Sequence, residues 1–301
     1  MPELIDYKKY LDPALVSKLK SLDLKAKAVV EGFMVGLHKS PYHGFSVEFT
    51  QHRSYQQGDP IKDIDWKVYG KSEKFFIKQY EEETNLICHI LLDNSKSMNF
   101  KNKSNVSKLE YSQVLSASLI YLLLQQQDSV GLTLYSDRIE NYTPPKSNKI
   151  HLKTLLTSIA KSKSSNKTNT SECLVKAIEN IKRRGLVILI SDFFDDIEQT
   201  LTALKKIHYK KNEIILFQVL DPIELSFAFG RDAVFKDLET DEELTSQPFH
   251  IQKAYREAFN EFLNKIKNEC LRYNIDYNLV LTTDNYDKAL MNFYKKRVKL
   301  N

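Results

Sequence analysis

Cysteine is scarce in this sequence, with three residues in a chain of 301: Cys88, Cys173 and Cys270. Their odd number and wide spacing exclude a disulfide framework and a thiolate metal site of the usual spacing. We expect all three to be small buried residues of a protein that works in a reducing compartment.

Long hydrophobic runs are also missing. The longest candidates are Leu119–Leu124 and Leu186–Ile190, whereas a membrane-spanning helix needs about 18 or more apolar residues. The mean hydropathy is −0.42, and the first residues lack the basic-then-apolar order of a secretion signal. These features predict a cytoplasmic protein without a membrane span.

Several motifs of enzymes and nucleotide-binding proteins are absent. The chain has no Gly-x-x-x-x-Gly-Lys loop, no Gly-x-Gly-x-x-Gly turn and no Gly-x-Ser-x-Gly elbow. We therefore expect no binding of ATP or a dinucleotide by this chain and no serine hydrolase. The histidines show no metal-ligand spacing, and a zinc site at His38, His43 and His52 is a weak alternative because a fourth ligand is missing.

A strong excess of one charge is missing too. Lys+Arg number 44 against 39 for Asp+Glu, which gives a formal net charge of +5, and the lysines are spread along the chain. This pattern predicts no nucleic-acid partner. Hydrophobic residues make up 42% of the chain, which is enough for a sizeable core.

The pattern of the sequence divides the chain into two parts, residues 1–83 and residues 84–301. Residues 1–83 predict a helix over 12–31 and then a small β-rich unit, because glycines and prolines separate three short strand-like runs. Those predicted strands are 45–50, 64–69 and 74–80.

Residues 84–301 alternate buried strands with amphipathic helices. This order predicts an α/β fold in which helices cover both faces of a mostly parallel sheet. We predict strands at 86–92, 130–135, 186–190, 213–220 and 276–281, with an edge strand at 138–142. We predict helices at 108–127, 149–161, 172–183, 197–208, 251–273 and 286–299, and an irregular segment at 222–248.

Polar residues follow two of the buried strands. Asp93, Ser95 and Ser97 form an Asp-x-Ser-x-Ser loop after the first strand, Asp192 follows strand 186–190, and Thr168 precedes the helix between them. Ligands of an open parallel sheet bind beyond the carboxyl ends of its strands. Because these donors are all oxygen atoms, they predict a site for a hard cation, Mg²⁺ or Mn²⁺, with a position left for a partner's carboxylate.

A structural interpretation of the same loop stands beside this one. An Asp-x-Ser-x-Ser triplet arises by chance in roughly one chain of this length in ten, and Ser95 or Ser97 could simply cap a helix. The position of the loop directly after a buried strand, with Asp192 and Thr168 at two other strand–helix connections, favours the metal site.

These residues resemble the metal-ion-dependent adhesion site (MIDAS) of von Willebrand factor type A domains. The resemblance implies a type A-like, Rossmann-like fold from residue 86 onward. It matches the five ligand positions to Asp93, Ser95, Ser97, Thr168 and Asp192. Asn166 and Lys167 stand where type A domains often have glycines, so Thr170 is an alternative to Thr168.

The upstream sequence adds a second resemblance. Residues 53–59 (RSYQQGD), residues 64–66 (IDW) and Met98 resemble a bacterial family catalogued as domain of unknown function 58. Lys62 and residues 69–71 depart from the family's usual pattern. The resemblance implies a protein-interaction module that works with a MoxR-type AAA+ ATPase and with other type A-domain proteins.

The 53–66 segment also has a physical interpretation of its own. The Arg53 guanidinium has three carboxylates, those of Asp59, Asp63 and Asp65, within reach for a bidentate pair. Trp66 is the single tryptophan, and we expect it to be a core anchor between the small unit and the sheet. A binding hot spot is the alternative role for this residue.

Two functional classes remain open. The first is a non-enzymatic interaction module that uses a metal to bind a carboxylate of a partner protein. The second is a metal-dependent phosphohydrolase of haloacid-dehalogenase type, with Asp93 as nucleophile and Asp192, Asp195 or Asp196 holding the ion. That class would need a second aspartate where Ser95 stands, so the sequence favours the interaction module.

Overall fold

The computed structural model of this chain describes most of its residues. The described ranges are 11–38, 52–54, 66–72, 74–78, 86–102, 106–162, 170–229, 233–236, 243–246 and 248–298. The chain divides into two compact units, which are described separately: unit 1 contains residues 1–40 and 86–301, and unit 2 contains residues 41–85.

Unit 1 is built around a six-stranded sheet in the order β10-β7-β6-β3-β4-β5. Five strands are parallel, and the edge strand β5 runs antiparallel to β4. The strands are β3 (Ile87–Asp93), β4 (Ser129–Tyr135), β5 (Ile139–Lys146), β6 (Leu186–Ser191), β7 (Glu213–Leu220) and β10 (Asp276–Leu281). This mostly parallel, Rossmann-like α/β architecture confirms the predicted fold class.

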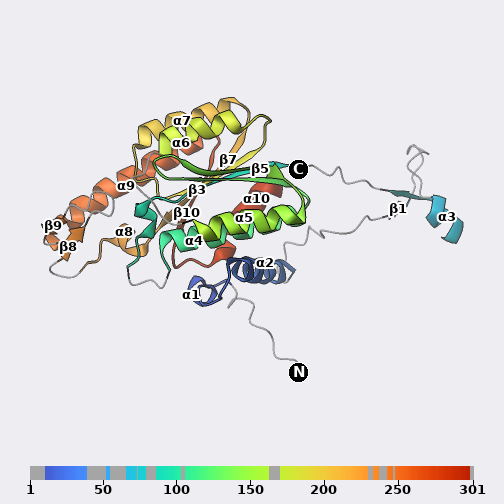
Figure 1. Cartoon of the computed structure of the whole chain (residues 1–301), viewed down its shortest axis with the longest axis horizontal. Coiled ribbons are helices and arrows are strands. Elements are labelled where there is room, and N and C mark those ends of the chain that lie inside the picture. The colour runs from blue at the N-terminus through green and yellow to red at the C-terminus, as the bar shows by residue number, and fades with distance from the viewer. Residues whose placement is uncertain are drawn as a thin grey trace, which may run out of the picture. The chain divides into compact units, whose positions relative to one another are not determined.

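Helices cover both faces of this sheet (Figure 1). One face packs against α4 (Lys108–Gln125), α5 (Lys149–Lys161) and α10 (Tyr286–Val298), and the other against α6 (Thr170–Asn180), α7 (Ile197–Tyr209) and α9 (Pro248–Arg272). Successive residues of β3 alternate between the two cores, with Ile90 in the first and Leu91 in the second. Both faces are therefore buried, which explains the nearly continuous apolar character of the strands.

The helix α4 is buried on most of its surface because the N-terminal helix α2 (Leu22–His38) packs on its outer side. Val29, Val30 and Phe33 of α2 belong to the same core as the sheet. A helix that is enclosed in this way needs apolar residues around its whole circumference. The Ser107 side chain accepts a hydrogen bond from the Glu110 N–H and fixes the first turn of α4.

The N-terminal region therefore differs from the expected division at residue 83. The helix that we predicted over 12–31 consists of α1 (Pro13–Val16) and α2, and both contribute to the core of unit 1. Contact with α4, which is far away in the sequence, places this region in the larger unit. A change in composition along the chain gives no sign of such a contact.

Unit 2 contains a short antiparallel pair, β1 (His52–Ser54) with β2 (Phe76–Lys78), and the helix α3 (Trp66–Ser72). The strand predicted at 74–80 is confirmed in part, because β2 covers residues 76–78 of it, and the one at 45–50 lies outside the described residues. The strand predicted at 64–69 is wrong where it is described, because residues from Trp66 onward form α3. The rings of Trp66 and Tyr69 meet edge-on at helical spacing.

The prediction of an irregular segment between residues 222 and 248 is wrong as well. This stretch contains the short helix α8 (Pro222–Ser226) and the antiparallel pair β8 (Ala233–Lys236) and β9 (Glu243–Ser246). Strands of four residues are too short to show an alternating pattern. Pro222 begins α8 after Asp221, whose side chain accepts the Ile223 N–H and caps the helix.

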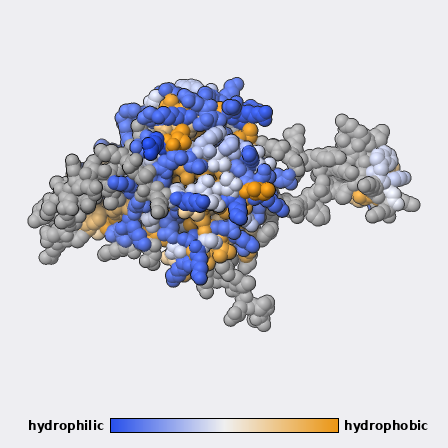
Figure 2. Space-filling model, in the orientation of Figure 1, coloured by the Kyte–Doolittle hydropathy of each residue, from blue (hydrophilic) through white to orange (hydrophobic). Residues whose placement is uncertain are grey.

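The three cysteines are buried and form no disulfide, as we predicted for their burial. Burial raises the pKa of Cys173 and of Cys270 to about 12, so both stay as thiols. Within the described part of the chain, none of the helices combines the length and the apolar character that crossing a membrane requires. On the face shown in Figure 2, the described hydrophobic residues form small separate spots among hydrophilic ones.

Candidate functional site

The Asp93 carboxylate ends β3 and is fully buried. Its Oδ1 accepts a hydrogen bond of 2.9 Å from the Ser95 N–H, and its Oδ2 accepts one of 2.6 Å from the Ser191 hydroxyl. The first bond closes a tight turn directly after the strand. The second ties Asp93 to the last residue of the neighbouring strand β6, so the ends of the two central strands hold this carboxylate in place.

The two serines of the loop lie together after Asp93. Their Oγ atoms are 3.0 Å apart, and Ser97 belongs to the short 3-10 helix Lys96–Asn99, which begins directly after Ser95. Ser95 stands at the N-cap position of that helix, but its side chain makes no capping hydrogen bond. For Ser95, the structural interpretation as a helix cap is therefore wrong, and its hydroxyl lies beside the Asp93 carboxylate instead.

Burial first, and then the charge of Asp192, raise the pKa of Asp93 to about 7. Hydrogen bonds from Ser191 and Ser95 oppose this shift. Asp93 and Asp192 thus lie close enough to repel each other, as predicted from the ends of β3 and β6. A cation between them would remove that repulsion.

The Asp192 carboxylate is also fully buried, but unlike Asp93 it contacts a positively charged side chain. Its Oδ2 accepts a hydrogen bond of 2.7 Å from the Lys108 ammonium, and its Oδ1 accepts one of 3.1 Å from the Phe194 N–H. The Asp192 main-chain oxygen accepts a bond of 2.8 Å from the Gln218 amide on β7. Asp192 is therefore fixed by three neighbours and belongs to an ion pair.

Lys108 is the functional-site residue that the sequence analysis missed. It begins α4, is 1% exposed and contacts a second carboxylate, that of Glu224, at 2.7 Å. The Phe194 and Phe100 rings lie 4.7 Å and 5.6 Å from its ammonium. Burial lowers the pKa of Lys108, but the charges of Asp192 and Glu224 outweigh burial and hold the pKa above its usual value.

A signal for Lys108 does exist in the sequence. A cation in the first turn of a helix is opposed by the helix dipole, so a lysine at that position needs another reason to be there. Its partner Glu224 is 116 residues away in the sequence. No local pattern predicts the pair.

Thr168 lies outside the described residues, but the alternative ligand Thr170 is described. Thr170 begins α6 and is fully buried, and its hydroxyl oxygen has no hydrogen-bond partner among the described residues. Its hydroxyl lies close enough to the buried Tyr135 phenol to affect the pKa of that group, and Asp93 lies close to the same phenol. Because the described residues leave this buried oxygen without a hydrogen bond, it is available as a metal ligand.

The aspartates that the phosphohydrolase interpretation would use for the ion have other tasks. The Asp195 Oδ2 accepts a hydrogen bond of 2.7 Å from the Thr170 N–H at the start of α6. Asp196 caps α7 and accepts a bond of 3.1 Å from the Gln199 N–H. Both carboxylates are thus engaged at helix N-termini, where a negative charge is favourable.

The donors around Asp93 suit a hard cation. In the described part of the chain, no three His, Cys, Asp or Glu side chains gather in an arrangement that could hold a metal ion. The set at β3 and β6 is instead one carboxylate with serine and threonine hydroxyls and a second carboxylate close by. Mg²⁺ and Mn²⁺ accept such neutral oxygen donors and keep several water molecules.

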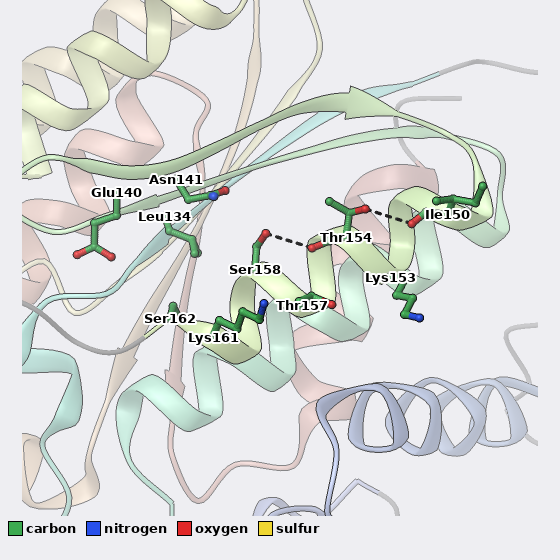
Figure 3. A pocket seen from close by; sticks show the side chains of 10 residues that line it. All are labelled: Leu134, Glu140, Asn141, Ile150, Lys153, Thr154, Thr157, Ser158, Lys161 and Ser162. Atoms are coloured by element: carbon green, nitrogen blue, oxygen red, sulfur yellow. Dashed lines mark hydrogen bonds between the residues drawn. The ribbon is translucent and has the colours of Figure 1, made fainter.

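A separate hollow of about 660 Å³ lies between β5 and α5 (Figure 3). Two of its hydroxyls are bound to carbonyls of their own helix, with Thr154 donating to Ile150 and Ser158 donating to Thr154. One of its lining residues, Glu140, also accepts a hydrogen bond of 2.8 Å from the amide of Asn94, the residue after Asp93. The Glu140 contact makes β5 a support of the Asp93 loop.

The family is decided by the match between this sequence and a family model. The model described as protein of unknown function DUF58 matches residues 51–269. The chain belongs to the DUF58 family. The segments that suggested this relationship, 53–59 and 64–66, fall within the matched range, although the side chains of Arg53, Asp59, Asp63 and Asp65 lie outside the described residues.

Relatives of this DUF58 chain include the uncharacterized protein Rv1480 of Mycobacterium tuberculosis (strain ATCC 25618 / H37Rv). It is 25% identical over 254 residues, which cover 82% of this chain and 77% of the relative. The uncharacterized protein Mb1516 of Mycobacterium bovis matches with the same identity and coverage. Neither name assigns a function.

Solved structures show a more distant likeness. The conserved hypothetical protein BatB from Bacteroides thetaiotaomicron is 18% identical and aligns with a TM-score of 0.47 over 71% of this chain and 99% of its own. An aerotolerance-related membrane protein from Bacteroides fragilis aligns with a TM-score of 0.48 at 19% identity over the same shares.

Proposed function

We propose that this DUF58 chain is a non-enzymatic, cytoplasmic protein-interaction module that binds its partner through a divalent cation. The observation that carries the proposal is the buried Asp93 carboxylate. It lies close to Asp192 and to the Ser95 hydroxyl, which in turn lies 3.0 Å from the Ser97 hydroxyl. Asp192 is paired with the Lys108 ammonium, whereas Asp93 has no cationic partner among the described residues, and a buried carboxylate without one favours a ligand of positive charge.

The residues present fit Mg²⁺ or Mn²⁺. Asp93, Ser95 and Ser97 would hold the ion, with Thr170 or Thr168 as a further hydroxyl and Asp192 nearby. The orphaned Thr170 oxygen supports this assignment. The bound ion would supply an electropositive position for a carboxylate of the partner, as the resemblance to the adhesion site of type A domains implies.

For the partner we propose a MoxR-type AAA+ ATPase, with other type A-domain proteins as further candidates. The support is the membership in the DUF58 family together with the absence of a nucleotide-binding motif from the sequence. In this scheme the ATPase supplies the energy, and the chain serves as its adaptor or assembly factor. Binding of the two purified proteins, or a change in ATPase rate, in the presence of Mg²⁺ and nucleotide tests the partnership.

The phosphohydrolase alternative gains one feature from the structure, a lysine next to Asp192. However, the Lys108 ammonium is 1% exposed and is bound by two carboxylates, so it does not face a substrate. Ser95 also stands where that chemistry needs an acid. We expect no turnover of a generic phosphate ester, and turnover that Asp93→Asn abolishes would support the alternative.

The metal itself is tested by thermal unfolding of the full chain. At ten times the dissociation constant, Mg²⁺ or Mn²⁺ should stabilise the fold by about 1.4 kcal/mol, which corresponds to a rise in melting temperature of roughly 3–6 °C. Asp93→Ala should remove the rise, and the double change Ser95→Ala with Ser97→Ala should weaken it. Neutral hydroxyls give modest affinity, so the titration extends into the millimolar range.

Two matched variants control this measurement. Ser158→Ala removes a hydroxyl that is bound within α5, and Asp196→Asn neutralises an exposed aspartate at the start of α7. Both should keep the full metal-dependent rise. A melting temperature that ignores both ions up to millimolar concentration contradicts the proposed function.

A further inference from the structure

We propose that Lys108 is a built-in counter-ion that withholds Asp192 from the bound cation, so that Asp93 is the one carboxylate that contacts the cation directly. The inference rests on the proposed cation site and assigns the role of its second carboxylate.

The hydrogen bonds of the two aspartates differ in kind. Among the described residues, Asp93 accepts bonds from neutral groups, namely the Ser95 N–H and hydroxyl and the Ser191 hydroxyl, and these leave its charge uncompensated. Asp192 accepts a bond of 2.7 Å from the Lys108 ammonium, and its other oxygen accepts the Phe194 N–H. A cation that approached Asp192 would have to compete with a charge that is already in contact with it.

Lys108 is held in this position from its other side as well. Its ammonium contacts Glu224 Oε1 at 2.7 Å. The other oxygen of Glu224 accepts a hydrogen bond of 2.7 Å from the Asp221 N–H at the end of β7. The lysine therefore joins the end of β6 to the segment that follows β7, through ion pairs of 2.7 Å with Asp192 and with Glu224.

Two aromatic rings lie against the ammonium, and the Lys108 side chain is 1% exposed. The Phe194 ring lies 4.7 Å from Lys108 Nζ and the Phe100 ring lies 5.6 Å from it. Attraction between an ammonium and a ring face is strongest where water is absent. An ion pair that is screened so little by solvent does not exchange its partner readily.

The charges of the cluster show what this arrangement does for a partner. The carboxylates of Asp93, Asp192 and Glu224 carry three negative charges. With the Lys108 ammonium and a divalent cation in place, the net charge of the cluster is zero. Without the ammonium, the same cluster would carry one negative charge and would repel an acidic group. Lys108 thus lowers the affinity for the metal and preserves the ability of the metal to attract a carboxylate.

Calorimetric titration of the full-length chain with MgCl₂ and with MnCl₂ tests this role. Lys108→Met removes the charge and keeps the length of the side chain, so Asp192 becomes available and the metal should bind about tenfold tighter. Adding Asp192→Asn to that variant should return the affinity to the wild-type value. Lys176→Met is the matched control, because Lys176 forms an exposed pair with Glu172.

The outcomes separate this inference from the proposed function. If the wild type binds the metal and Lys108→Met binds it more tightly, the result supports both the inference and the proposed function. If Lys108→Met alone binds the metal, the result supports the role of the lysine but overturns the metal dependence of the native protein. Equal binding by both proteins overturns the inference and leaves the function intact. Binding by neither overturns both.

A second variant keeps the test decisive if Lys108→Met does not fold. Asp192→Asn in the wild-type background should change the Mg²⁺ affinity by less than about threefold, because a carboxylate that does not contact the cation contributes little to its binding. Asp93→Asn should abolish binding. Equal losses in the two variants would overturn the inference.

Discussion

At the scale of single residues, the burial of Asp93 makes the stability of the metal-free protein depend on pH. The folded-state pKa of about 7 lies above the ordinary value of 3.8. Between these values, the folded protein keeps a proton that the unfolded chain has released. The contribution of Asp93 to the free energy of unfolding therefore falls as the pH rises from about 4 to about 7 and is constant above that range.

The variant Asp93→Asn tests this pH dependence. In a chelator, wild type and variant should be similar near pH 4, and the variant should be more stable by about 2–4 kcal/mol at pH 8. Urea unfolding at a series of pH values measures the difference. Parallel curves for the two proteins would show that Asp93 is ionised at no cost in the fold.

His89 makes the comparison with the variant necessary. Burial lowers the pKa of His89 to about 4, so its contribution to stability rises with pH between about 4 and 6.5. This slope opposes that of Asp93 in the wild-type curve alone. Because Asp93→Asn keeps His89, the difference between the two proteins isolates the carboxylate.

Among the site residues, those that follow a strand were predictable and those that depend on distant contacts were not. Asp93 and Asp192 end two apolar strands, and parallel strands bring their carboxyl ends together. Lys108 and the orphaned Thr170 oxygen depend on packing between α4, α6 and the sheet. No spacing in the sequence contains that information.

At the scale of elements, the site lies at the carboxyl ends of β3 and β6, and it depends on how closely the same two strands approach each other at their N-terminal ends. Gly185 precedes β6, and a Cβ atom at this position would lie 2.2 Å from the Ile87 carbonyl oxygen of β3. The Gly185 N–H also donates to the Asn212 side chain, and its carbonyl accepts the Glu213 N–H at the start of β7. One glycine thus sets the spacing of three strands.

Gly185→Ala should destabilise unit 1 by about 1–3 kcal/mol, because backbone atoms must move to admit the methyl group. The measurement is the unfolding midpoint in urea, followed by far-ultraviolet circular dichroism. Gly70→Ala is the matched control, since no atom of the described residues lies within 4 Å of a Cβ there. An unchanged midpoint for Gly185→Ala would mean that the strands separate easily.

The elements also show where prediction from sequence succeeds. For α5, β7 and β10, the predicted and observed bounds coincide, because each has a strong period or a continuous apolar run between clear breaks. The prediction failed for α3 and for the pair β8 and β9, which are short and show no period. Short elements take their conformation from neighbours that the local sequence does not name.

At the scale of the whole molecule, the chain divides into two units, and Phe33 lies in unit 1 whereas Trp66 lies in unit 2. Phe33 is 2% exposed, and its ring meets that of Tyr294 edge-on within the core of unit 1. Trp66 is 57% exposed and lies in α3 of unit 2, unlike the buried anchor that we expected. Since it is the one tryptophan of the chain, its fluorescence reports on unit 2.

Phe33→Ala should therefore affect one unit and not the other. Loss of the ring should cost unit 1 about 3–5 kcal/mol, which lowers its melting temperature by roughly 6–20 °C. Circular dichroism, which is dominated by the helices of unit 1, should show this shift, while the tryptophan fluorescence transition stays in place. Trp66→Ala should leave the circular dichroism midpoint unchanged. If the two signals shift together in Phe33→Ala, the units unfold as one cooperative body, and the N-terminal helix then stabilises both.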